Sequence, residues 1–468
     1  MMRSLYSGVS GLKVHQTKMD VIGNNISNVN TVGFKSSSVT FTDIFYQTSQ
    51  ASSGPNAATG AGGTNAKQIG LGSSLGAIST NITTQGGSQR TDNPFDLMIS
   101  GESFFVVNDG TTNYFTKAGN FTVDANGTLV TSSGNSVMGW RADDEGNIIQ
   151  DRVKSLQIMS ETNMTTSPQA TASATAYGNI NRSDDAYAVG GSGNIPLSVS
   201  FYDNLGYEYK ANFNITQIDA LTGEYNVRLK TVTLDSNVIF DYDTATDDVK
   251  TAIGDDVNFT LLFNMDKGDS VAEENVQLAD GSTTVSTLEG IQPGGMMKAD
   301  NIATFDFNGI ISSMGTIEID FSTVTNYGSS TTIDSKRGDL EDLNGGKGVG
   351  KMSSIAIQQD GKVVASYSNG DIKTVGQIVV ASFANAAGLE KVGDNLYAAT
   401  LNSGEFNGIG MDVTADGGKF STGVLEMSNV DLATEFTDMI VTQRGFQANS
   451  RIITTSDSML EELISLKR

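Results

Sequence analysis

Residues 5–35, LYSGVSGLKVHQTKMDVIGNNISNVNTVGFK, carry the pattern that decides how the ends of this 468-residue chain fold. Leu5, Val9, Leu12, Gln16 and Met19 follow one another there at intervals of four, three, four and three residues, and Ile22 and Ile26 continue at three and four, which is typical of one face of an α-helix. We expect a helix from Ser4 to Asn28, with Ser4 as its N-cap and Gly33 just past its end. The apolar stripe of this helix comprises Leu5, Val9, Leu12, Met19, Ile22 and Ile26.

The other end of the chain repeats the pattern over a longer span. We expect a second helix that begins near Ser428 or Asn429, either of which can act as the N-cap, with Lys467 and Arg468 at the negative end of the helix dipole. Two narrow stripes can pair antiparallel but leave apolar surface uncovered, so we expect other chains to bury the rest. The second stripe comprises Leu432, Phe436, Met439, Phe446, Ile453, Leu460 and Leu463.

Between these ends the sequence predicts β-structure. Glycine is frequent (52 residues) and proline rare (5 residues), as in a chain with many tight turns and no proline-rich linker. Asn-Gly and Asp-Gly pairs between short apolar runs are strong hairpin signals. They begin at Asp109, Asn126, Asp280, Asn308, Asp360, Asn369, Asn407 and Asp416.

The predicted fold is therefore α+β and mostly β. Terminal α-helices pair as a coiled-coil-like stalk, and two or three barrel- or sandwich-like β-rich domains are nested between them. We assign residues 1–32 and 425–468 to a terminal helical polymerisation domain and residues 33–89, rich in small and polar residues, to an extended connector. Residues 90–158 and 348–424 form a discontinuous inner β domain, and residues 159–347 an inserted outer β domain of one or two subdomains.

Charge and composition exclude several classes of function. With 29 Lys and Arg against 53 Asp and Glu, the net charge of −24 argues against nucleic-acid binding through a basic surface. The chain has no cysteine and one histidine, which excludes disulfides, thiolate nucleophiles and histidine-rich metal sites. No apolar stretch reaches the length of a membrane span or of a signal-peptide core, so we expect no membrane insertion and no cleaved signal peptide.

Few segments suggest chemistry. Asp124–Gly127 and Asp143–Gly146 resemble the start of a calcium loop but lack its remaining ligands, so we interpret both as turns. The glycine-rich stretch Gly345–Lys351 resembles a phosphate-binding loop, but Met352 stands where that loop needs Ser or Thr. His15 has no carboxylate one helical turn away, so we interpret it as a polar helix-face residue. We therefore expect no catalytic, cofactor-binding or metal site.

Several blocks resemble a known family. Residues 5–12 and 23–35 at the N-terminus, and residues 428–450 near the C-terminus, are similar to the terminal signatures of the axial proteins of the bacterial flagellum, the rod and hook family. Residues 119–140 and 388–397 are similar to blocks of that family's β domain. The family motif residues in this chain are Asn24, Asn25, Asn28, Gly33 and Phe34.

The resemblance implies a structural protein and no enzyme. The long central insertion favours a hook subunit, which polymerises into a short curved tube and transmits torque as a universal joint. A distal rod protein is one alternative, and a secreted β-rich adhesin or enzyme with a helical oligomerisation stalk is another. The implied partners are further copies of the chain, the flagellar type III export apparatus, the hook cap, the distal rod and the hook–filament junction proteins. The implied location is extracellular, in the hook and basal body.

Overall fold

The chain divides into two compact units. The computed structural model describes residues 2–55, 60, 62–143, 145–181, 183–184, 193–219, 223–246, 258–263, 295–296 and 301–466. Unit 1 comprises Met1–Asn163, Ser354–Ser366 and Ile372–Arg468, and unit 2 comprises Met164–Ser353 and Tyr367–Asp371. Strands predominate and α-helices lie at the two ends of the chain, which confirms the predicted mostly β, α+β fold.

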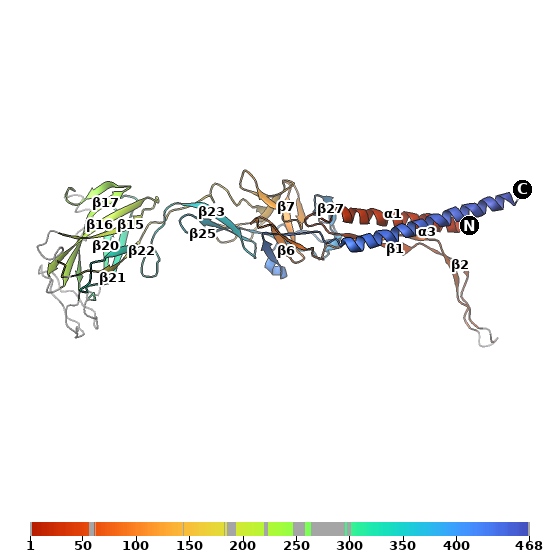
Figure 1. Ribbon diagram of the computed structural model, residues 1–468, viewed down its shortest axis with the longest axis horizontal. Helices are drawn as coiled ribbons and strands as arrows, with labels where there is room; N and C mark the ends of the chain where they lie inside the picture. Colours follow the sequence, from red (N-terminus) through yellow and green to blue (C-terminus); the bar gives the residue numbers. More distant parts are fainter. Residues whose placement is uncertain are drawn as a thin grey trace. The chain divides into compact units, whose positions relative to one another are not determined.

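Two antiparallel helices, α1 (Met2–Ser27) and α3 (Leu432–Ser465), lie side by side in unit 1 (Figure 1). The predicted N-caps are wrong. Ser4 lies inside α1, because the helix already begins at Met2. The N-cap of α3 is Asp431, whose side chain accepts a hydrogen bond from the Ala433 N–H, so the carboxylate also meets the positive end of the helix dipole. Lys467 and Arg468 lie outside the described residues.

The segment predicted as an extended connector pairs with itself. Strand β1 (Ser37–Asp43) pairs antiparallel with β4 (Ser73–Thr80), and β2 (Tyr46–Gln50) pairs with β3 (Lys67–Gly70). Both β1 and β4 also contact α1. Strand pairing and contacts with α1 therefore order this segment within a single chain.

The rest of unit 1 is an antiparallel β domain. Its core contains Phe105, whose ring meets Phe121 edge-on at 4.9 Å and stacks on Phe420 at 5.6 Å. Strand β5 (Ser88–Arg90) pairs with β30 (Val424–Glu426), and β6 (Leu97–Ser100) pairs with β29 (Lys419–Thr422). The other elements are β7 (Phe104–Asn108), β8 (Asn113–Thr116), β9 (Phe121–Val123), β10 (Leu129–Thr131), β11 (Ser136–Arg141), β12 (Lys154–Ser155), β24 (Lys362–Tyr367), β25 (Ile372–Ile378), β26 (Val380–Ala381), η2 (Ala386–Gly388), β27 (Glu390–Gly393), β28 (Leu396–Ala398) and η3 (Val413–Asp416).

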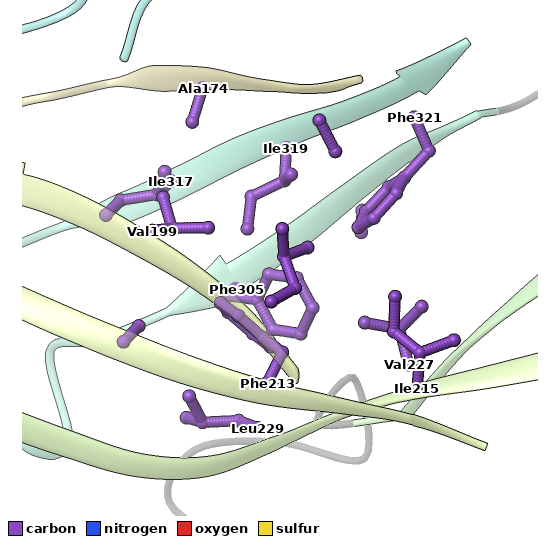
Figure 2. Packing of buried hydrophobic residues seen from close by; sticks show 14 of the residues in the cluster. Ala174, Val199, Phe213, Ile215, Val227, Leu229, Phe305, Ile317, Ile319 and Phe321 are labelled. Atoms are coloured by element: carbon purple, nitrogen blue, oxygen red, sulfur yellow. The ribbon is translucent and has the colours of Figure 1, made fainter. Parts of the chain in front are cut away.

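Unit 2 contains two sheets whose apolar faces pack on each other. One sheet has the strand order β20-β21-β14-β22, and the other has the order β15-β16-β17-β18 with β19 also paired to β17. Figure 2 shows the apolar side chains that fill the space between them, among them Phe213, Phe305 and Phe321. The strands are β13 (Thr165–Thr166), β14 (Ser173–Asn179), β15 (Ile195–Tyr202), β16 (Glu208–Asp219), β17 (Glu224–Leu234), β18 (Asn237–Asp241), β19 (Asn258–Leu262), β20 (Ile302–Asp306), β21 (Thr316–Thr325) and β22 (Asp334–Arg337); β23 (Gly350–Ile357) pairs with β13 and β24.

Most of the predicted hairpin turns are confirmed. The Asn-Gly and Asp-Gly pairs that begin at Asp109, Asn126, Asp360 and Asn369 join antiparallel neighbours, respectively β7–β8, β9–β10, β23–β24 and β24–β25. The pair at Asn308 lies between the antiparallel strands β20 and β21. The pair at Asp416 ends η3, and the pair at Asn407 lies in a loop, so neither forms a hairpin. The pair at Asp280 lies outside the described residues.

The two cores allow a test of their independence. Phe213→Ala removes a fully buried ring from unit 2, and we expect it to lower the stability of that unit by about 3–5 kcal/mol. The single tryptophan, Trp140, lies buried in unit 1 and reports unfolding of that unit alone. In a denaturant titration of Phe213→Ala, part of the circular-dichroism change should occur at a lower denaturant concentration than in the unmodified protein. The midpoint of the Trp140 fluorescence transition should stay the same.

The matched control is Phe420→Ala in unit 1, which should move the Trp140 transition instead. If both signals shift together in both variants, the two cores unfold as one and the division into units fails as a thermodynamic description.

Candidate assembly interface

Glycines bring α1 and α3 into close contact. A Cβ atom added at Gly11 would lie 2.8 Å from Asn449 Nδ2, and one added at Gly445 would lie 2.7 Å from the His15 ring. A Cβ added at Gly8 would lie 3.2 Å from Ile453 Cγ1. A larger residue at any of these positions would have to displace the facing side chain or the helix that carries it. We refer to this contact zone, from Ser4 to Asn25 on α1 and from Glu435 to Ser456 on α3, as the seam.

Polar side chains make the remaining identified contacts across the seam. The Ser4 and Ser456 hydroxyls are 3.3 Å apart, and Asn25 Nδ2 donates to Glu435 Oε1 at 2.9 Å. Lys18 Nζ lies 3.5 Å from Asp438 Oδ2, but both side chains are partly exposed, so this ion pair contributes little to stability. The seam is therefore made largely of small and polar groups, and most of the apolar side chains of α3 are left for other contacts.

His15 lies in the seam, which corrects its prediction as a simple helix-face residue. Its ring contacts Phe41 of β1 edge-on at 5.9 Å, and Gly445 faces it from α3. Its Nδ1 atom is buried and has no hydrogen-bond partner among the described residues. Burial, with a smaller contribution from Lys18, lowers the pKa of His15, so the neutral imidazole is the form that this position favours.

The predicted stripe residues do not share one environment. Ile22 is buried, whereas Val9 (52%), Leu432 (39%), Phe436 (50%) and Leu463 (50%) are exposed in the single chain. The half-buried members are Leu5, Leu12, Met19, Ile26, Met439, Phe446, Ile453 and Leu460. The stripes therefore divide between the seam and solvent.

Sequence reasoning missed several exposed apolar positions of α3, of which Ile440 lies in line with two stripe residues. Ile440 is 59% exposed and follows Leu432 and Phe436 at four-residue intervals, so the three side chains form a ridge along α3. We call Leu432, Phe436 and Ile440 the α3 ridge. The spacing was visible in the sequence, but the 4-3 pattern selected Met439 in place of Ile440.

The motif asparagines fix the C-terminal end of α1. Asn25 is 1% exposed and makes three hydrogen bonds to two elements: it donates to Glu435 of α3, donates to the Ser37 carbonyl of β1 at 2.8 Å and accepts from the Ser37 N–H at 3.0 Å. Asn28 donates to the Asn24 carbonyl at 3.0 Å and accepts from Thr31 Oγ1 at 3.1 Å. Asn25 thus links both helices to β1, while Asn28 shapes the turn that leaves α1.

Gly33 and Phe34 place the chain against the β domain after that turn. Gly33 has a left-handed φ of 68°, and an added Cβ would lie 2.7 Å from the Ala118 backbone N. Its N–H donates to the Glu426 carbonyl at 2.7 Å. Phe34 is buried, with Lys391 Nζ 5.1 Å from its ring centroid. Both the backbone conformation and the close approach require glycine at position 33.

A buried ion pair lies beside this contact. Lys35 Nζ and Glu426 Oε1 are 2.7 Å apart, and both side chains are 1% exposed. Lys35 also donates to the Thr84 carbonyl at 2.7 Å, and Glu426 accepts from the Gly86 N–H at 3.0 Å. Sequence reasoning missed this pair, because the two residues lie 391 positions apart and belong to no periodic pattern.

Lys117 and Asn429 lie beside the Lys35–Glu426 pair, and we call these contacts between the segments that flank the two helices the junction. Burial lowers the pKa of Lys117 to about 8, although the Glu426 carboxylate acts in the opposite direction. Asn429, predicted as a helix cap, instead accepts from the Ser36 N–H at 2.8 Å and donates to the Asn81 carbonyl at 2.9 Å. The segments on either side of the two helices are therefore bound to each other and to the β domain by buried polar contacts.

The segments considered for chemistry have structural roles. The Asp124 carboxylate accepts from the Asn126 and Thr128 N–H groups in the β9–β10 turn, and no helix follows Gly345–Lys351, whose last residues begin β23. Of the turn at Asp143–Gly146, Asp144 lies outside the described residues. Across the described ranges, no three Asp, Glu or His side chains gather as a metal site would need. In the same ranges, no helix combines the length and apolar character that crossing a membrane takes.

Three family models match the chain. Residues 5–35 match the "Flagella basal body rod protein" model, residues 98–172 match the "Flagellar hook protein FlgE/F/G D1 domain" model, and residues 421–466 match the "Flagellar basal body rod FlgEFG protein C-terminal" model. The matched residues include the motif asparagines, Gly33, Lys35, Glu426 and all of α3.

Curated relatives match over the whole chain. The flagellar hook proteins FlgE of Treponema pallidum and Borreliella burgdorferi are 34% and 36% identical over 479 and 488 residues, covering 100% of both chains in each case. The flagellar basal-body rod protein FlgG of Bacillus subtilis is 30% identical over 468 residues, again with 100% of both chains covered.

The buried pair can be tested by removing one charge. Lys35→Met leaves the Glu426 carboxylate buried and uncompensated, so we expect unit 1 to lose about 3–5 kcal/mol of stability. Lys35→Met combined with Glu426→Leu should recover most of this loss. Arg90→Met, which breaks the exposed Arg90–Asp92 pair, is the control and should leave stability unchanged. Chemical denaturation followed by Trp140 fluorescence measures all three; equal losses in Lys35→Met and Arg90→Met would show that burial of the pair has no energetic consequence.

The close approach of the helices predicts different effects for two glycines of α1. Gly11→Leu should push α3 away and destabilise the helix pair by about 1–3 kcal/mol. Gly23→Leu should be neutral or slightly stabilising, because no atom lies within 4 Å of a Cβ at that position and leucine favours the helix by up to about 1 kcal/mol. Hydrogen exchange at α1 amides checks this: exchange should speed up in Gly11→Leu alone, and equal rates in the two variants would argue against a tight seam.

Proposed function

Because the chain belongs to the flagellar rod and hook protein family and is a structural subunit of the flagellar hook, we propose that its copies assemble through the outward faces of α1 and α3. The two hook relatives reported above are more similar to it (34% and 36%) than the rod relative (30%), and all three match its full length. A distal rod protein, the alternative within the family, therefore has the weaker support.

The α3 ridge carries this proposal. Leu432, Phe436 and Ile440 are 39%, 50% and 59% exposed in the single chain, and they lie on one face of a helix whose other face forms the seam. Full burial of such a side chain stabilises by about 1.5–3 kcal/mol, so even partial coverage of the ridge by a neighbouring copy favours association. We propose the same role for the exposed Val9 and Leu463 and for the half-buried stripe residues.

We propose that the polymer is a short curved tube that transmits torque as a universal joint. Residues 1–32 and 425–468 form its inner, polymerising layer, residues 33–89 connect outward, residues 90–158 and 348–424 form the inner β domain, and residues 159–347 form the outer one. Apolar contacts among the helices hold the tube together. In β15, exposed and half-exposed residues alternate with buried ones, which gives the outer domain a polar surface suited to exchangeable contacts.

The remaining roles follow from membership in the family. We infer that the protein acts outside the cell in the hook and basal body, after passage through the flagellar export apparatus. Its partners in addition to its own copies are the hook cap, the distal rod and the hook–filament junction proteins. We infer a purely mechanical role without enzymatic activity.

The test places a charge on the ridge. Phe436→Asp introduces a carboxylate where a neighbouring copy would bury the ring, so the protein concentration needed for assembly should rise at least tenfold while the monomer unfolds as before. Thr455→Asp, at an exposed polar position of the same helix, is the matched control and should assemble at nearly the normal concentration. Sedimentation and electron microscopy of the purified proteins give the answer; unimpaired tubes from Phe436→Asp would refute this interface.

A further inference from the structure

The outward face of the β16–β17 pair in unit 2 carries a group of polar side chains that have no role in the proposed assembly. Asn214 lies opposite Arg228, and Thr216 lies opposite Asn226. Side chains alternate across a strand, and the intervening Ile215, Val227 and Leu229 are fully buried on the other face. Figure 2 shows Ile215, Val227 and Leu229 on the core side of these strands. The polar residues therefore share the face opposite the core.

This face is hollowed into a pocket of about 440 Å³. Its volume lies within the range of small-molecule sites, about 300–1,000 Å³. Polar and charged side chains dominate the lining, whereas the buried residues of the same strands are apolar. The lining residues that matter here are Asn214, Thr216, Asn226, Arg228, Lys230 and Tyr242.

Arg228 is held in place at the wall of the pocket. Its guanidinium carbon lies 3.6 Å from the centroid of the Tyr242 ring, and its Nη2 lies 3.9 Å from Asp243 Oδ1. The second distance is too long for a hydrogen bond. Stacking uses the flat face of a guanidinium and leaves its N–H groups, which lie in the plane of the group, able to bind a carboxylate through two parallel hydrogen bonds.

Two further groups in the pocket lack partners. Asn226 Oδ1 is buried and has no hydrogen-bond partner among the described residues, and a buried acceptor without a donor is costly. Lys230 is exposed and forms none of the ion pairs found in the described part of the chain. The pocket thus offers one acceptor that needs a hydroxyl or amine donor, beside two cations; among the described residues, Arg228 has a carboxylate within 4 Å and Lys230 has none.

We propose that this pocket binds an acidic saccharide, a sugar that carries both hydroxyl groups and a carboxylate. A sugar hydroxyl donates to Asn226 Oδ1, and the carboxylate binds Arg228 and Lys230. Asn214 and Thr216 supply side chains that can donate to or accept from further hydroxyls. A neutral sugar leaves Lys230 without a counter-charge, and a simple dicarboxylate leaves Asn226 Oδ1 without a donor, so the combination of groups defines the ligand class.

The test titrates the full-length protein with glucuronate, N-acetylneuraminate, glucose and glutarate, with binding followed by saturation-transfer NMR and calorimetry. At least one acidic sugar should bind at least tenfold more tightly than glucose and glutarate. A preference for glucuronate indicates a uronic-acid polysaccharide as the source, and a preference for N-acetylneuraminate indicates a sialylated glycan. No binding of either acidic sugar, or equal binding of glutarate, overturns the proposal.

Variants locate the site. Lys230→Gln and Asn226→Ala should each weaken binding of the acidic sugar at least tenfold, while Lys210→Gln, an exposed charge on β16 outside the pocket, should change it less than twofold. Circular dichroism verifies that each variant folds. If Lys210→Gln and Lys230→Gln weaken binding of the acidic sugar equally, the sugar is attracted by surface charge in general, and the proposed site is wrong. Assembly of Lys230→Gln into tubes should be unaffected, so this test is independent of the hook interface.

Discussion

At Gly8, Gly11 and Gly445, helices α1 and α3 lie so close together that no additional side-chain atom fits between them without displacement. This close approach determines which residues can face which way. Small and polar residues make much of the contact, together with His15 and Ile453, and on α3 Leu432, Phe436 and Ile440 face away from it. The paired helices therefore leave an apolar surface exposed in the single chain.

The seam depends in turn on the junction at its base. The buried Lys35–Glu426 pair joins the segment after α1 to the strand before α3, and Gly33 presses the same segment against the backbone at Ala118. A buried ion pair is a weak source of net stability, but loss of either partner is costly, so it enforces one arrangement of the two segments. A defined geometry at this point links the two helices to the β domain of unit 1.

Local patterns in the sequence predicted local structure well. The helical periodicity around Leu5 and Leu432, the hairpin turn at Asn126-Gly127 and the mostly β middle of the chain all depend on neighbours within a few residues, and the structure confirms them. The predicted N-caps were wrong because residue type alone does not fix where a helix begins. Ser4, Ser428 and Asn429 are all suitable types, but Asp431 is the residue just before α3, and its side chain accepts a hydrogen bond from the Ala433 N–H. The environment of His15 and the Lys35–Glu426 pair depend on partners hundreds of residues away. Periodicity cannot reveal such contacts, and the placement of the stripe residues between seam and solvent depends on them too. The assignment of domains and of the polymerisation stripe stays a prediction.

Because the chain has no cysteine, a single introduced thiol can measure directly which helix face is covered by neighbouring copies. Ile440→Cys places the thiol on the exposed α3 ridge, and Thr442→Cys places it in the buried seam of the same helix. Rates of thiol alkylation should be high at position 440 and low at position 442 in the monomer, and low at both positions in assembled tubes. If position 440 reacts as fast in the tubes as in the monomer, neighbouring copies do not cover the ridge, and the hook interface described here is wrong.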